Sequence, residues 1–144
     1  MKLLSSAFRN HEEIPKKYTG EGEDISPPLS LVDVPAQTKS IALIVDDPDA
    51  PMGIFVHWIA WNIQPSNLEL TENAKLPNQG KNDFGDVRYG GPMPPKGESH
   101  RYFFKAYALD TELNLSNGIS KHELLDAIKS HVLDQAEYIG IYQR

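Results

Sequence analysis

The chain has 144 residues and a formal net charge of −6, with 14 Lys and Arg against 20 Asp and Glu. This length suits one domain, which we expect over residues 1–144, and the acidic balance argues against nucleic-acid binding. The chain contains no cysteine, which excludes disulfides and thiolate zinc sites and favours a cytoplasmic location. No stretch approaches the roughly 20 apolar residues of a membrane span.

The first quarter of the chain predicts two short strands separated by an irregular arm. Met1–Thr19 mixes apolar pairs with charged residues, which favours an edge strand followed by an arm without regular structure. Glycines and the pair Pro27–Pro28 then indicate a loop. Leu29–Val34 predicts another strand, because it is mostly apolar and Pro35 ends it.

The segment Ser40–Ile63 predicts two buried strands that flank a stiff acidic turn. Ile41–Val45 is apolar throughout, which indicates a strand buried on both faces, and Val56–Ile63 is a second apolar and aromatic run. The sequence DDPDAP between them cannot continue a central strand, because proline offers no backbone N–H. The two strands should be buried neighbours, with Asp47 beside His57 at one end of a sheet, where the carboxylate would favour a protonated imidazole.

A second stiff segment, Asp86–Arg101, contains three prolines and three glycines in sixteen residues. This composition forbids regular structure and restricts the loop to few conformations. The segment leads into the apolar strand Tyr102–Leu109, whereas Pro65–Gly85 before it predicts a polar surface loop. The sharp turns also suggest a cis peptide at Ala50–Pro51 or within Pro92–Pro95.

One helix is predicted, over Ser120–Glu137, and it is followed by a closing strand over Tyr138–Tyr142. Ser120 and Glu123 form a capping box, and Gly140 suits the helix stop. Apolar residues recur every four positions along the segment: Leu124, Ile128, Val132 and Ala136. Many short strands and one late helix predict a mainly β fold, an antiparallel β-sandwich with a C-terminal helix packed on the outside.

Four segments carry a recognisable pattern: IPKKYTGEGEDISPPLS (Ile14–Ser30), DDPDAP (Asp46–Pro51), HWIAWNI (His57–Ile63) and YGGPMPPKGESHRYFFKAYALD (Tyr89–Asp110). Together they resemble the phosphatidylethanolamine-binding protein family, and most closely its compact bacterial and archaeal branch of Raf kinase inhibitor-like proteins. The resemblance covers nearly the whole chain in the same order. It implies a β-sandwich with a shallow pocket for phosphoryl head groups, and homodimers in the prokaryotic branch.

The resemblance also implies which residues form the anion-binding pocket: Asp47, His57, Pro95, His100 and Tyr102. The residues themselves add two points. His100 and Tyr102 lie two apart at a strand start and so share one face of the sheet. Gly91 can offer a bare backbone N–H to an anion nest, although simple loop flexibility explains a glycine there equally well.

Most of these polar residues also have a purely structural explanation. His57 is explained as well by a core histidine, and Tyr102 by a core aromatic residue. Asp46 and Asp49 suit the capping of the acidic turn through backbone N–H groups. Arg101, which points away from Tyr102, suits a structural ion pair.

These features favour a non-enzymatic binding module, without a cofactor, for a small ligand that carries a phosphoryl or carboxylate group. One alternative, which the resemblance allows, is an inhibitor of a serine protease or kinase that acts through the loop Pro92–Gly97. Another is an acid–base hydrolase built on Asp47, His57 and His100, which lacks a nucleophile motif. These three residues could also bind zinc, but their spacing matches no metal motif, so no metal is expected.

Overall fold

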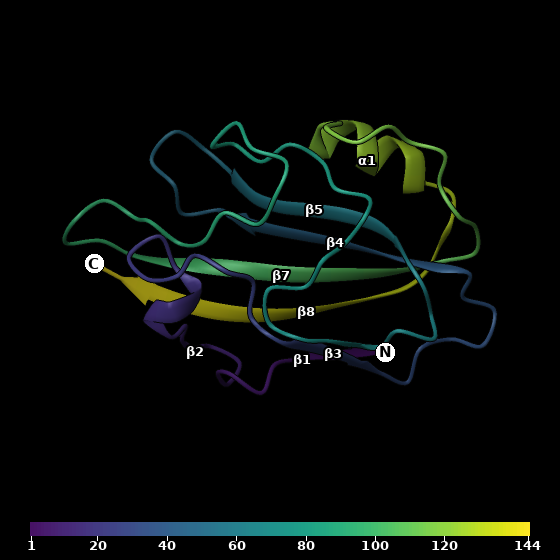
Figure 1. Ribbon diagram of the computed structural model, residues 1–144, viewed down its shortest axis with the longest axis horizontal. Helices are drawn as coiled ribbons and strands as arrows, with labels where there is room; N and C mark the ends of the chain where they lie inside the picture. Colours follow the sequence, from purple (N-terminus) through teal and green to yellow (C-terminus); the bar gives the residue numbers. More distant parts are fainter.

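The computed structural model describes residues 1–144 and contains two β-sheets and one α-helix (Figure 1). The larger sheet has the strand order β2-β8-β7-β4-β5, and the smaller has the order β1-β3-β6. The strands are β1 (Lys2–Leu4), β2 (Glu12–Glu13), β3 (Leu29–Val32), β4 (Ser40–Asp47), β5 (Phe55–Ile63), β6 (Glu69–Leu70), β7 (Ser99–Leu109) and β8 (Val132–Gln143). The helix α1 spans Lys121–Ile128, and a 3-10 turn, η1, spans Lys16–Tyr18. All strand pairs are antiparallel except β2 with β8.

The main apolar core lies between the two sheets. Leu3 of β1 and Leu31 of β3 belong to the same buried cluster as Leu43 of β4 and Phe104 of β7. The helix α1 covers the opposite face of the larger sheet, so that α1 and the pair β1 and β3 lie on opposite sides of it (Figure 1). This arrangement confirms the predicted mainly β fold with one helix on the outside.

The strand β4 is buried along its whole length because it has an apolar partner on each face. Ile41, Leu43 and Val45 belong to the core between the sheets, whereas Ala42 and Ile44 pack in the cluster beneath α1. β5 pairs with β4 in antiparallel register. The prediction that these two strands are buried neighbours is therefore confirmed.

The strand β5 is the last of its sheet, yet a loop covers its outer edge. The Gly80 N–H donates to the Ile59 carbonyl at 2.9 Å, and the Trp61 N–H donates to the Asn78 carbonyl at 3.1 Å. An edge strand left open would present unpaired backbone groups to other chains. The covered edge explains how a terminal strand can have the apolar sequence of a central one.

The predicted helix is correct in its first half and wrong in its second. The capping box of Ser120 and Glu123 is present, but α1 ends at Ile128, and the chain from Val132 to Gln143 forms β8. A spacing of four residues fits a helical face, but it also places every residue on one face of a strand, because four is a multiple of two. Gly140, predicted as the helix stop, lies inside β8 opposite Tyr102.

Several other boundaries also differ from the predictions. The strand predicted over Leu29–Val34 ends at Val32, and the strand predicted from Tyr102 begins at Ser99. No peptide bond is cis, so the predicted cis proline is wrong. Neither α1 nor η1 has the length and apolar character that crossing a membrane requires.

Candidate functional site

A cavity of about 200 Å³ opens where β4 ends and where β5 and β7 begin. β4 runs antiparallel to both neighbours, which brings these three strand ends together at the left of Figure 1. The acidic turn after β4 and the stiff loop before β7 complete the walls. The lining residues are Asp47, Ala50, Pro51, Phe55, His57, Phe84, Met93, Pro94, Pro95, His100 and Tyr102.

The cavity brings together five of the six residues predicted to bind an anion: Asp47, His57, Pro95, His100 and Tyr102. Gly91 is the exception. Its N–H donates to Oδ1 of Asp24 at 2.7 Å, and the N–H of Gly90 donates to the His57 carbonyl at 2.9 Å. Both amides are already paired within the protein, so the predicted anion nest is wrong.

His100 lies between two carboxylates. Its Nδ1 is 2.7 Å from Oδ2 of Asp47, and its Nε2 is 2.9 Å from Oε1 of Glu98. Burial disfavours the charged ring, but the hydrogen bonds that the ring donates to Glu98 and Asp47 outweigh burial and raise the pKa of His100. Because both partners are carboxylates that accept hydrogen bonds, this geometry favours the imidazolium form, in which each ring nitrogen carries a hydrogen and donates a hydrogen bond.

His57 lines the same cavity as Asp47, as predicted, but the two side chains form no hydrogen bond. The pairing of β4 with β5 shifts from Val45 opposite Trp58 to Asp46 opposite Val56, so His57 is the extra residue of a β-bulge. Its Nδ1 donates to the Gly90 carbonyl at 2.7 Å, which leaves Nε2 as the free ring nitrogen. Burial lowers the pKa of His57 despite that hydrogen bond, so the ring is neutral at pH 7.

Tyr102 contributes a buried hydroxyl without a hydrogen-bond partner. The residue is 1% exposed, lines the cavity, and packs edge-on against the His57 ring at a centroid distance of 5.1 Å. Burial, with Asp47 and Asp49 nearby, raises the pKa of the Tyr102 hydroxyl well above its usual value. The group therefore stays protonated and is a free donor at the cavity.

Three further residues that the sequence singled out, Asp46, Asp49 and Arg101, lie outside the cavity. Asp49 accepts hydrogen bonds from the backbone N–H of Arg101 and, at 2.8 and 2.9 Å, from its guanidinium. Asp46 is 1% exposed and points to the opposite face, where Oδ2 binds Lys121 Nζ at 2.7 Å and Lys105 Nζ at 3.3 Å. Neither aspartate caps the turn through a hydrogen bond to its backbone.

Sequence reasoning missed Glu98 and the aromatic wall of the cavity. Glu98 is an exposed acid among polar neighbours, so its sequence carried no signal for a contact with His100. Phe55 and Phe84 form an edge-on pair at a centroid distance of 4.8 Å, and each also contacts the His57 ring. Phe55 stands two residues before His57, a spacing from which a shared face could have been predicted.

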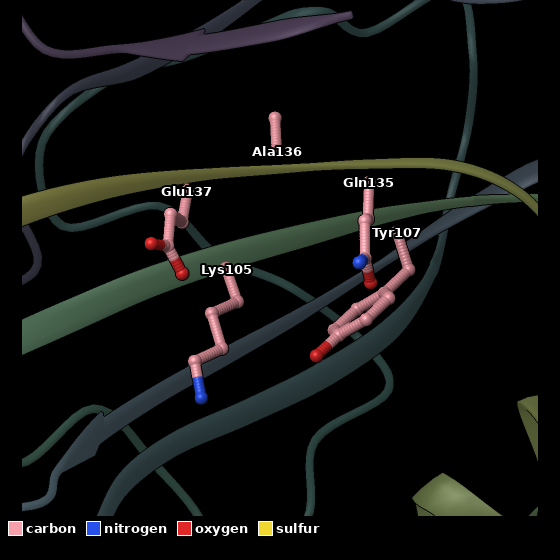
Figure 2. Close-up of a pocket in the computed structure, with 5 residues that line it drawn as sticks. All are labelled: Lys105, Tyr107, Gln135, Ala136 and Glu137. Carbon is pink, nitrogen blue, oxygen red and sulfur yellow. The ribbon is translucent and has the colours of Figure 1, made fainter.

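A larger cavity of about 460 Å³ lies on the opposite face of the same sheet and contains none of the predicted anion-binding residues. Lys105, Tyr107, Gln135 and Glu137 point to one side of β7 and β8, toward the side of α1, and Ala136 points to the other side (Figure 2). No residue of α1 lines this cavity. None of its side chains is buried with an unpartnered polar atom, so the smaller cavity is the stronger candidate site.

The side chains at the smaller cavity do not form a metal site. Asp47 and Glu98 both bind the His100 ring itself rather than converge with it on a common point. No group of three or more His, Asp or Glu side chains is arranged to hold a metal ion.

Comparisons with known proteins find similar chains in archaea and bacteria. The chain is 50% identical to a UPF0098 protein of Pyrococcus horikoshii, with 98% of this chain and 76% of the relative covered. It is also 50% identical to a UPF0098 protein of Methanothermobacter thermautotrophicus, with 100% and 99% covered. These relatives are archaeal, and others at 43–49% identity are archaeal or bacterial.

Two solved structures share the fold over nearly the whole chain. The first is a putative phosphatidylethanolamine-binding protein homologue from Chlamydia trachomatis, with a TM-score of 0.95, 44% identity, and 99% of this chain and 97% of that chain covered. The second is Escherichia coli YbcL, with a TM-score of 0.91, 32% identity, and 99% and 98% covered. The family model described as phosphatidylethanolamine-binding protein matches residues 4–143. The chain therefore belongs to the phosphatidylethanolamine-binding protein family.

Proposed function

We propose that the protein is a non-enzymatic binding module whose smaller cavity takes a small ligand with a phosphoryl or carboxylate group. The observation that carries the proposal is the Tyr102 hydroxyl, a buried donor at the cavity with no acceptor. An unsatisfied buried polar group costs about 1–3 kcal/mol, and an anionic oxygen bound there would remove that cost. The family name refers to phosphatidylethanolamine, whose head group carries a phosphoryl group.

The charges around the hydroxyl support the same proposal. Asp47 is the only acid among the lining residues, and its carboxylate is paired with the His100 imidazolium. His57 Nε2 is free to accept a proton from an acidic ligand, or to donate one when the ring is charged. The apolar walls from Phe55, Phe84 and the prolines keep water away from these groups, which strengthens their hydrogen bonds.

The same geometry argues against the hydrolase alternative. None of the lining residues is Ser, Thr or Cys, so the cavity offers no hydroxyl or thiol nucleophile of the usual kind. His100 has both nitrogens committed to carboxylates and is charged, which removes it as a general base. His57 alone, without a carboxylate to orient it, would have to activate water.

The protease or kinase inhibitor remains a second candidate because the stiff loop is held in one conformation. The Gly20 N–H donates to the Pro92 carbonyl at 2.9 Å, and Arg144 donates to the Pro94 carbonyl at 3.2 Å. Met93 is 41% exposed between these two anchors. A loop fixed before binding loses little entropy at an interface. If the protein inhibits a protease or kinase and Met93→Ala weakens that inhibition at least tenfold, this role would be supported. The cytoplasmic location stays a prediction.

The proposed ligand class is tested with dimethyl phosphate and acetate, titrated into the protein and followed by NMR chemical shifts. Tyr102→Phe should weaken both affinities about tenfold, because about 1.4 kcal/mol of hydrogen bonding is lost. Tyr89→Phe is the matched control, since that buried hydroxyl donates to the Tyr18 carbonyl at 2.7 Å and does not line the cavity. No saturable binding by the wild type would contradict the proposal, and sustained hydrolysis of a phosphomonoester would contradict its non-enzymatic part.

A further inference from the structure

Glu98 connects the solvent to a buried charge at the cavity. Its side chain is 48% exposed, whereas the side chains of His100 and Asp47 are each 4% exposed. Hydrogen bonds of 2.9 Å and 2.7 Å link the three residues in the order Glu98, His100, Asp47. Glu98 does not line the cavity, so it has no direct contact to offer a ligand there.

The protonation of His100 decides what an arriving anion meets. With the ring charged, the Asp47 carboxylate is compensated, and the arriving anion meets the free Tyr102 donor. With the ring neutral, Asp47 is the only ionised group among the lining residues and repels the anion. Like charges within a few ångströms repel strongly where water is partly excluded, so the charge on His100 changes anion affinity.

We infer that Glu98 is a positioning residue of the anion site: it holds the His100 ring in its protonated form, and the imidazolium in turn neutralises Asp47 for the incoming anion. The inference rests on the proposed function. It adds that Glu98, an exposed side chain outside the cavity, sets the highest pH at which the site binds an anion well. Without Glu98, His100 keeps its contact with Asp47 but loses one of the two hydrogen bonds that favour its charge.

Few charged or titratable groups face His100, so the effect of Glu98 on the ring can be measured apart from theirs. Asp47 comes from β4, His57 from β5, and Tyr142 lies opposite in β8. Asp49, beyond the end of β4, acts on His100 through its charge but is itself paired with Arg101. Glu98 is therefore the one acid that contacts the ring and can be replaced without changing the cavity wall.

The test compares the pH dependence of dimethyl phosphate affinity in the wild type and Glu98→Gln. This ligand keeps a single charge throughout, so any change comes from the protein. Glutamine can still accept a hydrogen bond from Nε2, but it removes the charge. Affinity is measured between about pH 6.5 and pH 9.5. The midpoint of its decline should lie about one pH unit lower in Glu98→Gln than in the wild type. At the lowest pH the two affinities should agree within about twofold. NMR titration of the His100 ring without ligand should show the same displacement.

Asp86→Asn is the matched control, because it removes one exposed carboxylate from the loop that carries Phe84, and the Asp86 side chain makes no hydrogen bond or ion pair. It should leave the pH profile unchanged. A uniformly weaker Glu98→Gln affinity without a displaced profile, or an unchanged profile, would overturn the inference while the proposed function stands. Absence of dimethyl phosphate binding by the wild type would instead overturn the proposed function, and the inference with it.

Discussion

The Oδ2 atom of Asp47 lies 2.7 Å from the Nδ1 atom of His100, and both side chains are buried. This contact joins the last residue of β4 to the second residue of β7, so it fixes the end of the sheet where the cavity opens. Because His100 has a raised pKa in the folded protein, protonation and folding favour each other. The contact therefore makes stability depend on pH.

Asp47→Asn should destabilise the protein most on the acid side of this dependence. The stabilisation from charged His100 is complete below its unfolded pKa of about 6.5 and is lost as the pH rises through the higher folded value. We expect the variant to lose about 1–3 kcal/mol of unfolding free energy near pH 6 and less near pH 9. Urea denaturation at both pH values measures the difference, and an equal loss at both would contradict the assignment of the charge to His100.

Asp49→Asn should give the opposite behaviour, because Asp49 pairs with Arg101 and has a lowered pKa of about 2. A carboxyl group whose pKa is lower in the folded protein stabilises the fold at any pH above its unfolded pKa. This stabilisation is lost as the pH falls toward the folded pKa. The cost should be about 0.5–1 kcal/mol, since the pair is partly exposed, and it should be the same at pH 6 and pH 9. Denaturation near pH 2.5 should show the variant and the wild type converging, and a cost that persists there would argue against the ion pair.

The fold was predictable where the pattern of apolar residues fits only one kind of secondary structure. β4 is apolar at every position because both faces are covered, and only a buried strand explains that in so short a segment. The segment after Ile128 was ambiguous, since its spacing of four fits both a helix and a strand. Pairing of β8 with the full length of β7 decides the outcome, and that pairing is a long-range contact that local sequence does not contain.

The candidate site was predictable as a set of residues but not as a set of contacts. Family motifs indicated Asp47, His57, His100 and Tyr102 together, and one cavity contains all four. The partner of Asp47 was assigned to the wrong histidine, because the bulge at His57 depends on the register between β4 and β5. Glu98 was missed, because an isolated exposed glutamate has no pattern that distinguishes it from a solvated side chain.

Gly140→Ala should destabilise the protein, because the N-terminal arm runs alongside β8 here and the side chains of Phe8 and Ile14 pack against Gly140. A Cβ there would collide with Cγ1 of Ile14 and lie 2.8 Å from a ring carbon of Phe8, and Ile14 is fully buried. Overpacking of this kind costs about 1–3 kcal/mol. Thermal or urea denaturation measures the loss.

The contact with Ile14 is tested by a double-mutant cycle. Ile14→Ala removes the two nearest atoms that the new Cβ would meet and leaves only the Phe8 ring, so the double variant should be more stable than the sum of the two single losses predicts, by about 0.5–2 kcal/mol. Strictly additive losses would mean that the cost of Gly140→Ala arises elsewhere, for example from the register of β8 with β7.

The homodimer expected from the family resemblance has a candidate surface beside the cavity. Met52 is 99% exposed and Ile54 is 59% exposed, and both lie in the turn between the lining residues Pro51 and Phe55. Phe84, another lining residue, is 46% exposed. Burying these side chains against a second copy would gain about 25 cal/mol for each Å² of apolar surface removed from water.

We therefore expect light scattering to give twice the chain mass of 16.1 kDa for the wild type. Met52→Glu should shift the mass to that of the monomer, because a charge in an apolar interface must be desolvated without a partner. Leu133→Glu is the control, since Leu133 is also exposed, at 40%, but lies near the start of β8, at the other end of the sheet from the cavity. A wild type that stays monomeric over a wide concentration range would contradict the dimer, and dissociation by Leu133→Glu instead of Met52→Glu would move the interface to the other end of the sheet.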